Sequence, residues 1–173
     1  MRDKRIITNG CRLLIALLLF LPATGFSQLS NRTSADAAAT VKAFYTYHFK
    51  DKFDYTRAGL LRRQKWLDAS LYQLLLAEDK KARAKKDEPP DLEGDPFTNS
   101  QEYPNAFKIG DTKEEYGKAI VEVVFVWKDK GKVVDERNVE VELSKVKNLW
   151  KISNIIDKTN PDGDLLHFLK RSK

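Results

Sequence analysis

The strongest secondary-structure signal in the chain lies in residues 118–156, which read KAIVEVVFVWKDKGKVVDERNVEVELSKVKNLWKISNII. Apolar side chains recur at every second position in Ala119–Trp127 and again in Val133–Val146, which is the period of a β-strand. A turn at Gly131 joins the two runs as a hairpin. A second short turn leads into Leu149–Ile156. The pattern predicts an antiparallel meander with one buried face and one solvated face.

Helical patterns precede this meander. Ala37, Val41, Phe44 and His48 recur at helical spacing and predict a helix over residues 35–50. The other expected elements are a helix over residues 64–86, an irregular connection over 91–105, a short strand over 107–109 and a terminal helical segment over 164–170. Together they predict an α+β fold, in which the N-terminal helices cover the apolar face of a curved antiparallel sheet of three to four strands.

The N-terminus has the pattern of a secretory signal peptide. Basic residues precede the apolar run Leu13–Leu21, and the small residues Gly25 and Ser27 suit cleavage before Gln28. The apolar run would extend about 14 Å as a helix, half of the roughly 30 Å hydrocarbon core of a bilayer. We therefore divide the chain into a signal peptide (1–27), a flexible segment (28–34), an α+β domain (35–160) and a C-terminal helical tail (161–173).

The position of the single cysteine bears on the expected cellular location, and the net charge bears on the expected partners. Cys11 precedes the apolar run, whereas lipid attachment requires a cysteine after it. We expect an exported protein, periplasmic or secreted, with no lipid anchor, no disulfide and no membrane span after cleavage. The net charge of +6 falls to +3 when residues 1–27 are removed. This weak positive charge argues against a nucleic acid partner.

Three short motifs carry a family resemblance. Val41-Lys-Ala-Phe-Tyr45, Asp95-Pro96-Phe97 and Trp150-Lys-Ile152 resemble the bacterial domain-of-unknown-function family 3828. The order of elements is similar to that of the wider nuclear transport factor 2-like (cystatin-like α+β) superfamily. The resemblance implies a small exported bacterial protein with a cone-shaped fold. It also implies that function stays open, because the superfamily includes isomerases and dehydratases that use Asp, Tyr and His inside the cone, and members that only bind ligands or partners.

His48 and Asp95 are the candidate catalytic residues. Histidine suits general acid–base chemistry near neutral pH, and a carboxylate can orient it. The alternative is structural: a packed histidine with one hydrogen-bonded nitrogen, and an aspartate that starts a turn before Pro96. The other histidine, His167, is distant in sequence and accompanies no cluster of carboxylates, so we expect no metal and no cofactor.

A ligand pocket between helices and sheet is the corresponding binding hypothesis. Its expected lining is aromatic with a few polar groups: Tyr45, His48, Trp66, Asp95, Phe97, Tyr103, Phe125, Trp127 and Trp150. Aromatic side chains at these spacings can equally form the core or its rim.

The leading functional prediction is a non-catalytic module of the bacterial cell envelope that binds a small apolar ligand or an envelope protein. An immunity-type protein that neutralises an exported toxin is one version of it, and a homodimer through the sheet is a further possibility. The alternative is an isomerase- or dehydratase-like enzyme with the His48/Asp95 pair in the pocket. The basic run Lys80–Lys86 offers either a polyanion-binding patch or a solvated helix end that complements the helix dipole.

Overall fold

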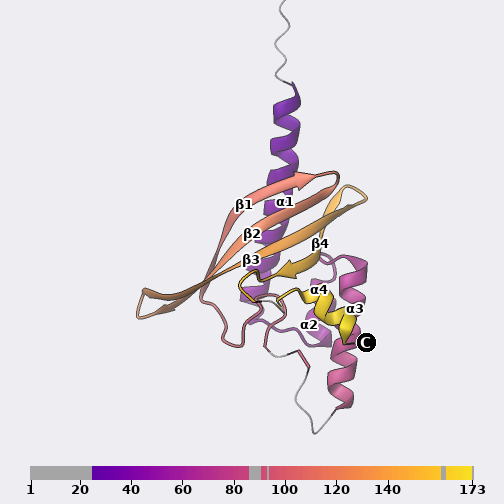
Figure 1. The fold of residues 1–173 in the computed structure, drawn as a ribbon, viewed down its shortest axis with the longest axis vertical. Coiled ribbons are helices and arrows are strands. Elements are labelled where there is room, and N and C mark those ends of the chain that lie inside the picture. Colours follow the sequence, from indigo (N-terminus) through magenta and orange to yellow (C-terminus); the bar gives the residue numbers. More distant parts are fainter. Residues whose placement is uncertain (1–24, 86–90, 93, 161–162, 173) are drawn as a thin grey trace, which may run out of the picture.

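The computed structural model describes residues 25–85, 91–92, 94–160 and 163–172 (Figure 1). Most of the predicted signal peptide, residues 1–24, lies outside them. The elements are α1 (Gly25–Lys50), α2 (Arg57–Arg63), α3 (Ala69–Ala84), β1 (Ala106–Glu115), β2 (Lys118–Asp129), β3 (Lys132–Val146), β4 (Leu149–Ile156) and α4 (Leu165–Arg171). No helix of the described part is long and apolar enough to cross a membrane.

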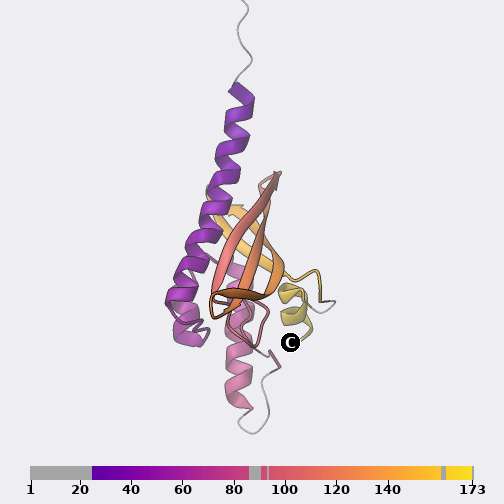
Figure 2. The ribbon, with the colours of Figure 1, turned by 90° about the vertical axis from the view of Figure 1, so that its left-hand side faces the viewer.

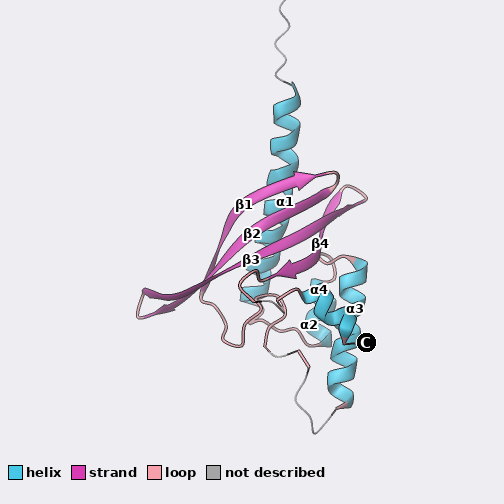
Figure 3. Ribbon diagram, in the orientation of Figure 1, coloured by secondary structure: helices cyan, strands magenta, loops and turns pink. Residues whose placement is uncertain are grey.

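Strands β1 to β4 form one antiparallel sheet in sequence order, as the strand arrows of Figure 3 show. The alternation of residues 118–156 predicted three of these strands, and each is present. The short strand expected at 107–109 is longer, because a register shift between Ile109 and Thr112 lets β1 continue along β2. The α+β prediction, with helices packed on an antiparallel sheet, is confirmed.

Helix α1 lies across one face of the sheet, and its first turns extend past the sheet (Figure 2). The predicted stripe of Ala37, Val41, Phe44 and His48 is fully buried. It meets the inward side chains of the strands, of which Phe125 lies with its ring centroid 5.1 Å from that of Tyr45. The core lies between the helices and the sheet, and buried side chains of α2, α3 and α4 contribute to it together with those of α1.

The first helix begins earlier than expected. Residues 28–34, predicted to be a flexible segment, are part of α1, which starts at Gly25. Residues 28–39 contain neither glycine nor proline, and residues 35–39 are rich in alanine, so nothing in the sequence prevents the helix from extending before residue 35.

The helix expected over 64–86 is shorter in the structure, where α3 covers Ala69–Ala84, and the helix before it, α2, was not predicted. Helix α2 ends at Arg63, and α3 begins after Asp68, whose side chain accepts a hydrogen bond from the Ser70 N–H as an N-cap. The connecting residues pair in parallel with the edge of β4 through Asp68 N–H to the Ile152 carbonyl (2.7 Å) and Ile152 N–H to the Trp66 carbonyl (2.8 Å). Pairing with the sheet edge keeps these residues out of α3 and covers part of that edge.

Candidate functional site

His48 and Asp95 meet in the core, where α1 faces residues 95–100. The Nε2 atom of His48 lies 2.8 Å from Oδ2 of Asp95, and both side chains are 0% exposed. His48 lies one helical turn after Phe44 on the buried stripe of α1. Asp95 is held by a loop that closes through its own N–H and the carbonyl of Ser100, 2.9 Å apart. The structure thus brings the candidate pair together.

A buried arginine completes this cluster. The Nε atom of Arg63 donates to Nδ1 of His48 (3.0 Å), and Nη1 donates to Asp51 (2.9 Å) and to the carbonyl of Gly59 (3.0 Å). A guanidinium can only donate, so Nδ1 of His48 is the acceptor and the ring proton lies on Nε2, where it is donated to Asp95. Nη2 of Arg63 is buried and has no hydrogen-bond partner in the described part of the chain.

Further hydrogen bonds fasten the 95–100 loop to α1. The Asp95 carboxylate accepts from the Thr98 hydroxyl (2.7 Å) and from the backbone N–H of Phe97 (3.2 Å). The Tyr45 hydroxyl donates to the Phe97 carbonyl (2.7 Å). Burial raises the pKa of Tyr45 well above its usual value, and the charge of Asp95 raises it further. The loop is therefore held at two points of the helix.

This geometry gives His48 a structural role. A general base needs a free lone pair, and the one lone pair of the neutral ring is taken by Arg63. Its ring is enclosed by Phe44, Phe53 and Phe97, whose centroids lie 5.7, 5.0 and 5.1 Å away. The cluster connects α1, α2 and the 95–100 loop. In the described part of the chain, no group of three potential ligands could hold a metal ion.

The prediction of one pocket lined by the aromatic set needs correction. Four members fill the core between helix and sheet and border none of the described depressions: Tyr45, His48, Phe97 and Phe125. The others divide among separate surface sites: Tyr103 with Trp127, Trp66 with Trp150, and Asp95 alone. The physical reason is that large side chains of α1 and of the loop occupy the space that a cone would leave open.

Arg63 is the member of this cluster that sequence reasoning missed. It follows Arg62 in a short basic helix of 7 residues, a pattern typical of a solvated surface. The available signal is its position one helical turn after the buried Leu60, because residues three apart lie on one face. Arg62 stays exposed and pairs with Asp51 (3.0 Å) and Asp54 (2.5 Å).

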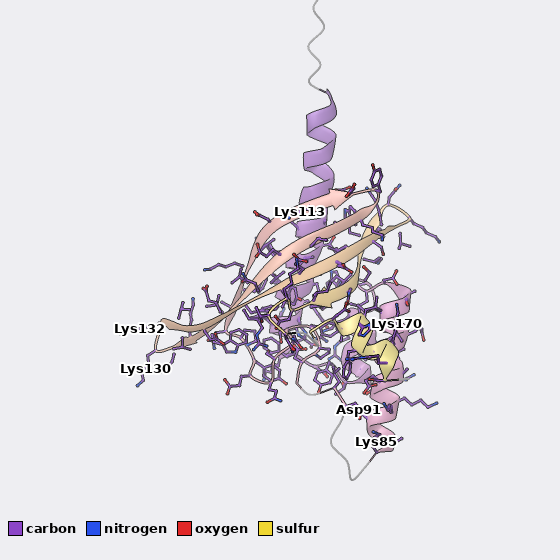
Figure 4. All side chains as sticks on the ribbon, in the orientation of Figure 1. Lys85, Asp91, Lys113, Lys130, Lys132 and Lys170 are labelled. Atoms are coloured by element: carbon purple, nitrogen blue, oxygen red, sulfur yellow. The ribbon has the colours of Figure 1, made fainter. Side chains whose placement is uncertain are left out.

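The basic run at the end of α3 is largely paired. Lys81 and Lys85 both contact Asp91, the latter at 3.0 Å, and these contacts lower the pKa of the Asp91 carboxyl. Arg83 pairs with Asp79 at 2.6 Å. Figure 4 labels Lys85 and Asp91 at this end of the molecule. Local carboxylates thus neutralise much of the positive charge that binding of a polyanion would require. This favours the interpretation of the run as a solvated helix end.

The β2–β3 hairpin projects from the body of the protein. Strand β1 pairs with β2 only as far as Val126, whereas β2 and β3 remain paired to Asp129 and Lys132. Beyond Val126 the hairpin tip therefore has no neighbouring strand among the described residues, and Figures 1 and 4 show it extending away from the helices. Val133 and Val134 are 53% and 63% exposed on it. An ordered, accessible apolar element of this kind is suited to contact with another protein.

Comparisons with known proteins address the fold. No family model matches the chain, and no curated protein sequence matches it. Among solved structures, the chain is similar to a chain in the crystal structure of the type VI native effector–immunity complex Tae3–Tai3 from Ralstonia pickettii. The TM-score is 0.53 at 22% sequence identity, over 73% of this chain and 96% of that chain. At this identity the likeness shows a shared fold.

Proposed function

We propose that this protein is an exported protein-binding module of the immunity type, which neutralises an exported toxin by binding it. The observation that carries the proposal is the likeness to a chain of an effector–immunity complex over 96% of that chain's length. The basic and apolar N-terminal pattern supports export, and the motifs that resemble family 3828 agree with an exported bacterial protein.

The candidate chemistry favours the binding role over the enzymatic one. In the His48 cluster each ring nitrogen has a protein partner, and the ring has no exposed surface. An enzyme needs an acid or base that can reach its substrate.

The hairpin tip is our proposed contact element for the partner. Val133 and Val134 offer apolar area, and Lys128, Lys130 and Lys132 outnumber the two acidic residues of the tip, Asp129 and Asp135. Apolar side chains would supply binding energy, and the net positive charge would steer a partner whose binding surface is acidic.

A growth-rescue assay tests this proposal. Proteins exported by the same bacterium are directed one at a time to the periplasm of a test strain, with and without co-expression of the full chain. We expect the chain to restore growth against a toxic exported protein and to co-purify with it. Failure to rescue growth against any toxic export would contradict the proposal.

Substitutions at the hairpin then test the contact element. The double variant V133S/V134S should lose rescue, because it removes exposed apolar area without touching the core. The matched control is V146S/L149S, which changes exposed apolar residues (41% and 62%) on either side of the turn between β3 and β4 and should rescue like the unmodified chain. Equal rescue by both variants would show that the partner binds elsewhere.

A further inference from the structure

A groove separate from the His48 cluster lies between α3 and the segment 52–56. Its volume is about 460 Å³, which is within the usual range for small-molecule sites. Its apolar walls are formed by Phe53, Tyr55, Leu60, Leu75, Leu92 and Tyr103. Of the residues predicted to line a pocket, only Tyr103 borders it.

One wall of the groove is held in place by the core. The ring of Phe53 stacks on that of Tyr103 with centroids 4.5 Å apart, and its other neighbour is His48 at 5.0 Å. The Phe53 N–H also donates to the His48 carbonyl (3.0 Å). The aromatic wall is therefore preorganised for a ligand.

Glu78 breaks the apolar pattern of α3 at this groove. It follows Leu71, Leu74 and Leu75 on the same helical face, where the spacing calls for another apolar residue. The residue is 7% exposed, and its Oε1 atom has no hydrogen-bond partner among the residues that the structure describes. A buried carboxyl oxygen without a partner is costly to stability. Such a departure from the pattern of the element is typical of a functional position.

The cations near Glu78 are engaged elsewhere. Lys81 and Lys85 bond to Asp91, and on the groove lining Arg83 pairs with Asp79. Burial raises the pKa of Glu78, an effect that the charges of Lys81 and Lys85 only partly oppose. Among the described residues, Glu78 thus forms no ion pair, and its carboxyl group lies next to apolar walls.

We propose that this groove binds a small amine with an apolar body, whose ring or chain contacts Phe53 and Tyr103 and whose ammonium group pairs with Glu78. An ammonium donor would supply the missing hydrogen bond and the counter-charge together. The aromatic walls favour a cation with an attached apolar body over a bare ion. This proposal is independent of the binding of a toxin.

NMR titration with two matched probes tests the groove. The ¹⁵N-labelled protein, recovered after export from cells expressing the full chain, is titrated with 2-phenylethylamine and with its uncharged analogue 2-phenylethanol. We expect the amine to shift the amide resonances of residues 52–56 and 75–83 and to bind more tightly than the alcohol. No shift of these resonances up to the solubility limit of the amine would overturn the proposal.

Two variants distinguish the contribution of the Glu78 carboxyl group to binding from that of the apolar walls. E78Q should weaken binding of the amine by about tenfold or more, the loss of a charged hydrogen bond, and leave binding of the alcohol unchanged. E122Q, on the outer face of the sheet, removes the same charge and should bind the amine normally. Unchanged amine affinity in E78Q would also overturn the proposal.

Tyr103→Ala provides a second test that does not depend on the fold of E78Q. Tyr103 is 49% exposed, so its removal spares the core. Both probes should bind more weakly, because the variant loses one aromatic wall. Unchanged binding of the amine would place it outside the groove and contradict the proposal. Growth rescue by E78Q, measured separately, distinguishes failure of this proposal from failure of the proposed function.

Discussion

His48 has a protein partner on each ring nitrogen, and this shows how one residue connects three parts of the fold. It donates to Asp95 in the loop and accepts from Arg63 in α2, while its own backbone lies in α1. Both charged partners are buried, so each depends on the imidazole for a hydrogen bond. A cluster of this kind contributes to stability only while every member is present.

Replacement of His48 by phenylalanine should therefore be strongly destabilising. The ring volume is kept, but Asp95 and Arg63 each lose a buried partner, and we expect the free energy of unfolding to fall by about 3–5 kcal/mol. Urea denaturation followed by tryptophan fluorescence measures the change. The control is His167→Phe on the exposed side of α4, expected within about 0.5 kcal/mol of the unmodified chain. Similar values for the two variants would refute the structural role of His48.

Because Tyr45 is buried, we expect the protein to lose stability at alkaline pH. Its folded-state pKa is raised by burial, so the protonated form is favoured on folding. This stability is fully present below the unfolded pKa of about 10 and declines as the pH rises above that value. At pH 7, Tyr45→Phe should cost about 1–3 kcal/mol, since the Phe97 carbonyl loses its donor.

The pH dependence of unfolding of two variants tests whether Tyr45 causes the loss of stability. The stability gap between the unmodified chain and Tyr45→Phe should narrow between pH 9 and pH 11 in urea titrations. Tyr116→Phe, at a side chain that is 96% exposed, should parallel the unmodified chain throughout. A constant gap for Tyr45→Phe would contradict the argument.

At the scale of elements, the corner between α1 and α2 depends on charge. Partial burial acts to raise the pKa of Asp51, but hydrogen bonds and charges from Arg62 and Arg63 outweigh it and hold the pKa below its usual value. The pKa of Asp54 is likewise lowered, first by the Thr56 hydroxyl, against the opposing effect of burial, and with help from Arg62. The corner that positions α2 should therefore weaken in acid.

Acid titration of Asp51→Asn tests the corner. A lowered folded-state pKa contributes stability that is present above the unfolded value of about 3.8 and is lost as the pH falls through the folded value. The variant should be less stable than the unmodified chain at pH 7, and the gap should close below the folded pKa. Asp129→Asn on the exposed hairpin is the control and should show no such convergence. A gap that stays constant in acid would argue against the pairing.

At the scale of the whole molecule, one core joins the helices and the sheet. Side chains of α1, α3, α4 and all four strands belong to the same buried cluster or pack directly against it. Helix α4 contributes Leu165 and Leu169, although it forms the last element of the chain. A continuous core predicts a single cooperative unfolding transition.

Leu169→Ala tests this coupling. Leu169 is 2% exposed, and its truncation should lower the free energy of unfolding by about 2–5 kcal/mol. Far-UV circular dichroism and tryptophan fluorescence should report the same lowered urea midpoint. Leu166→Ala, at a half-buried neighbour, should cost less. Separate transitions by the two probes would show that α4 unfolds independently.

The sequence allowed prediction of the elements whose periodicity is strong and local. The stripe of α1 and the alternation of β2 and β3 each record burial on one face, so the α+β class and the buried position of His48 could be predicted from them. The start of α3 at Ala69 instead of residue 64 could not, because the residues before it pair with β4, which is distant in sequence.

The chain by itself determined which residues are apolar and at what period, and with these the strands, the main helices and the presence of a histidine on a buried face. Only the tertiary structure decided what His48 faces. Arg63 and Asp95 reach it from α2 and from the 95–100 loop, and together with aromatic rings they fill the space predicted to be a pocket. The open groove lies instead beside Glu78. The reason is physical: periodicity records whether a side chain is buried, whereas its partners depend on packing between segments far apart in sequence.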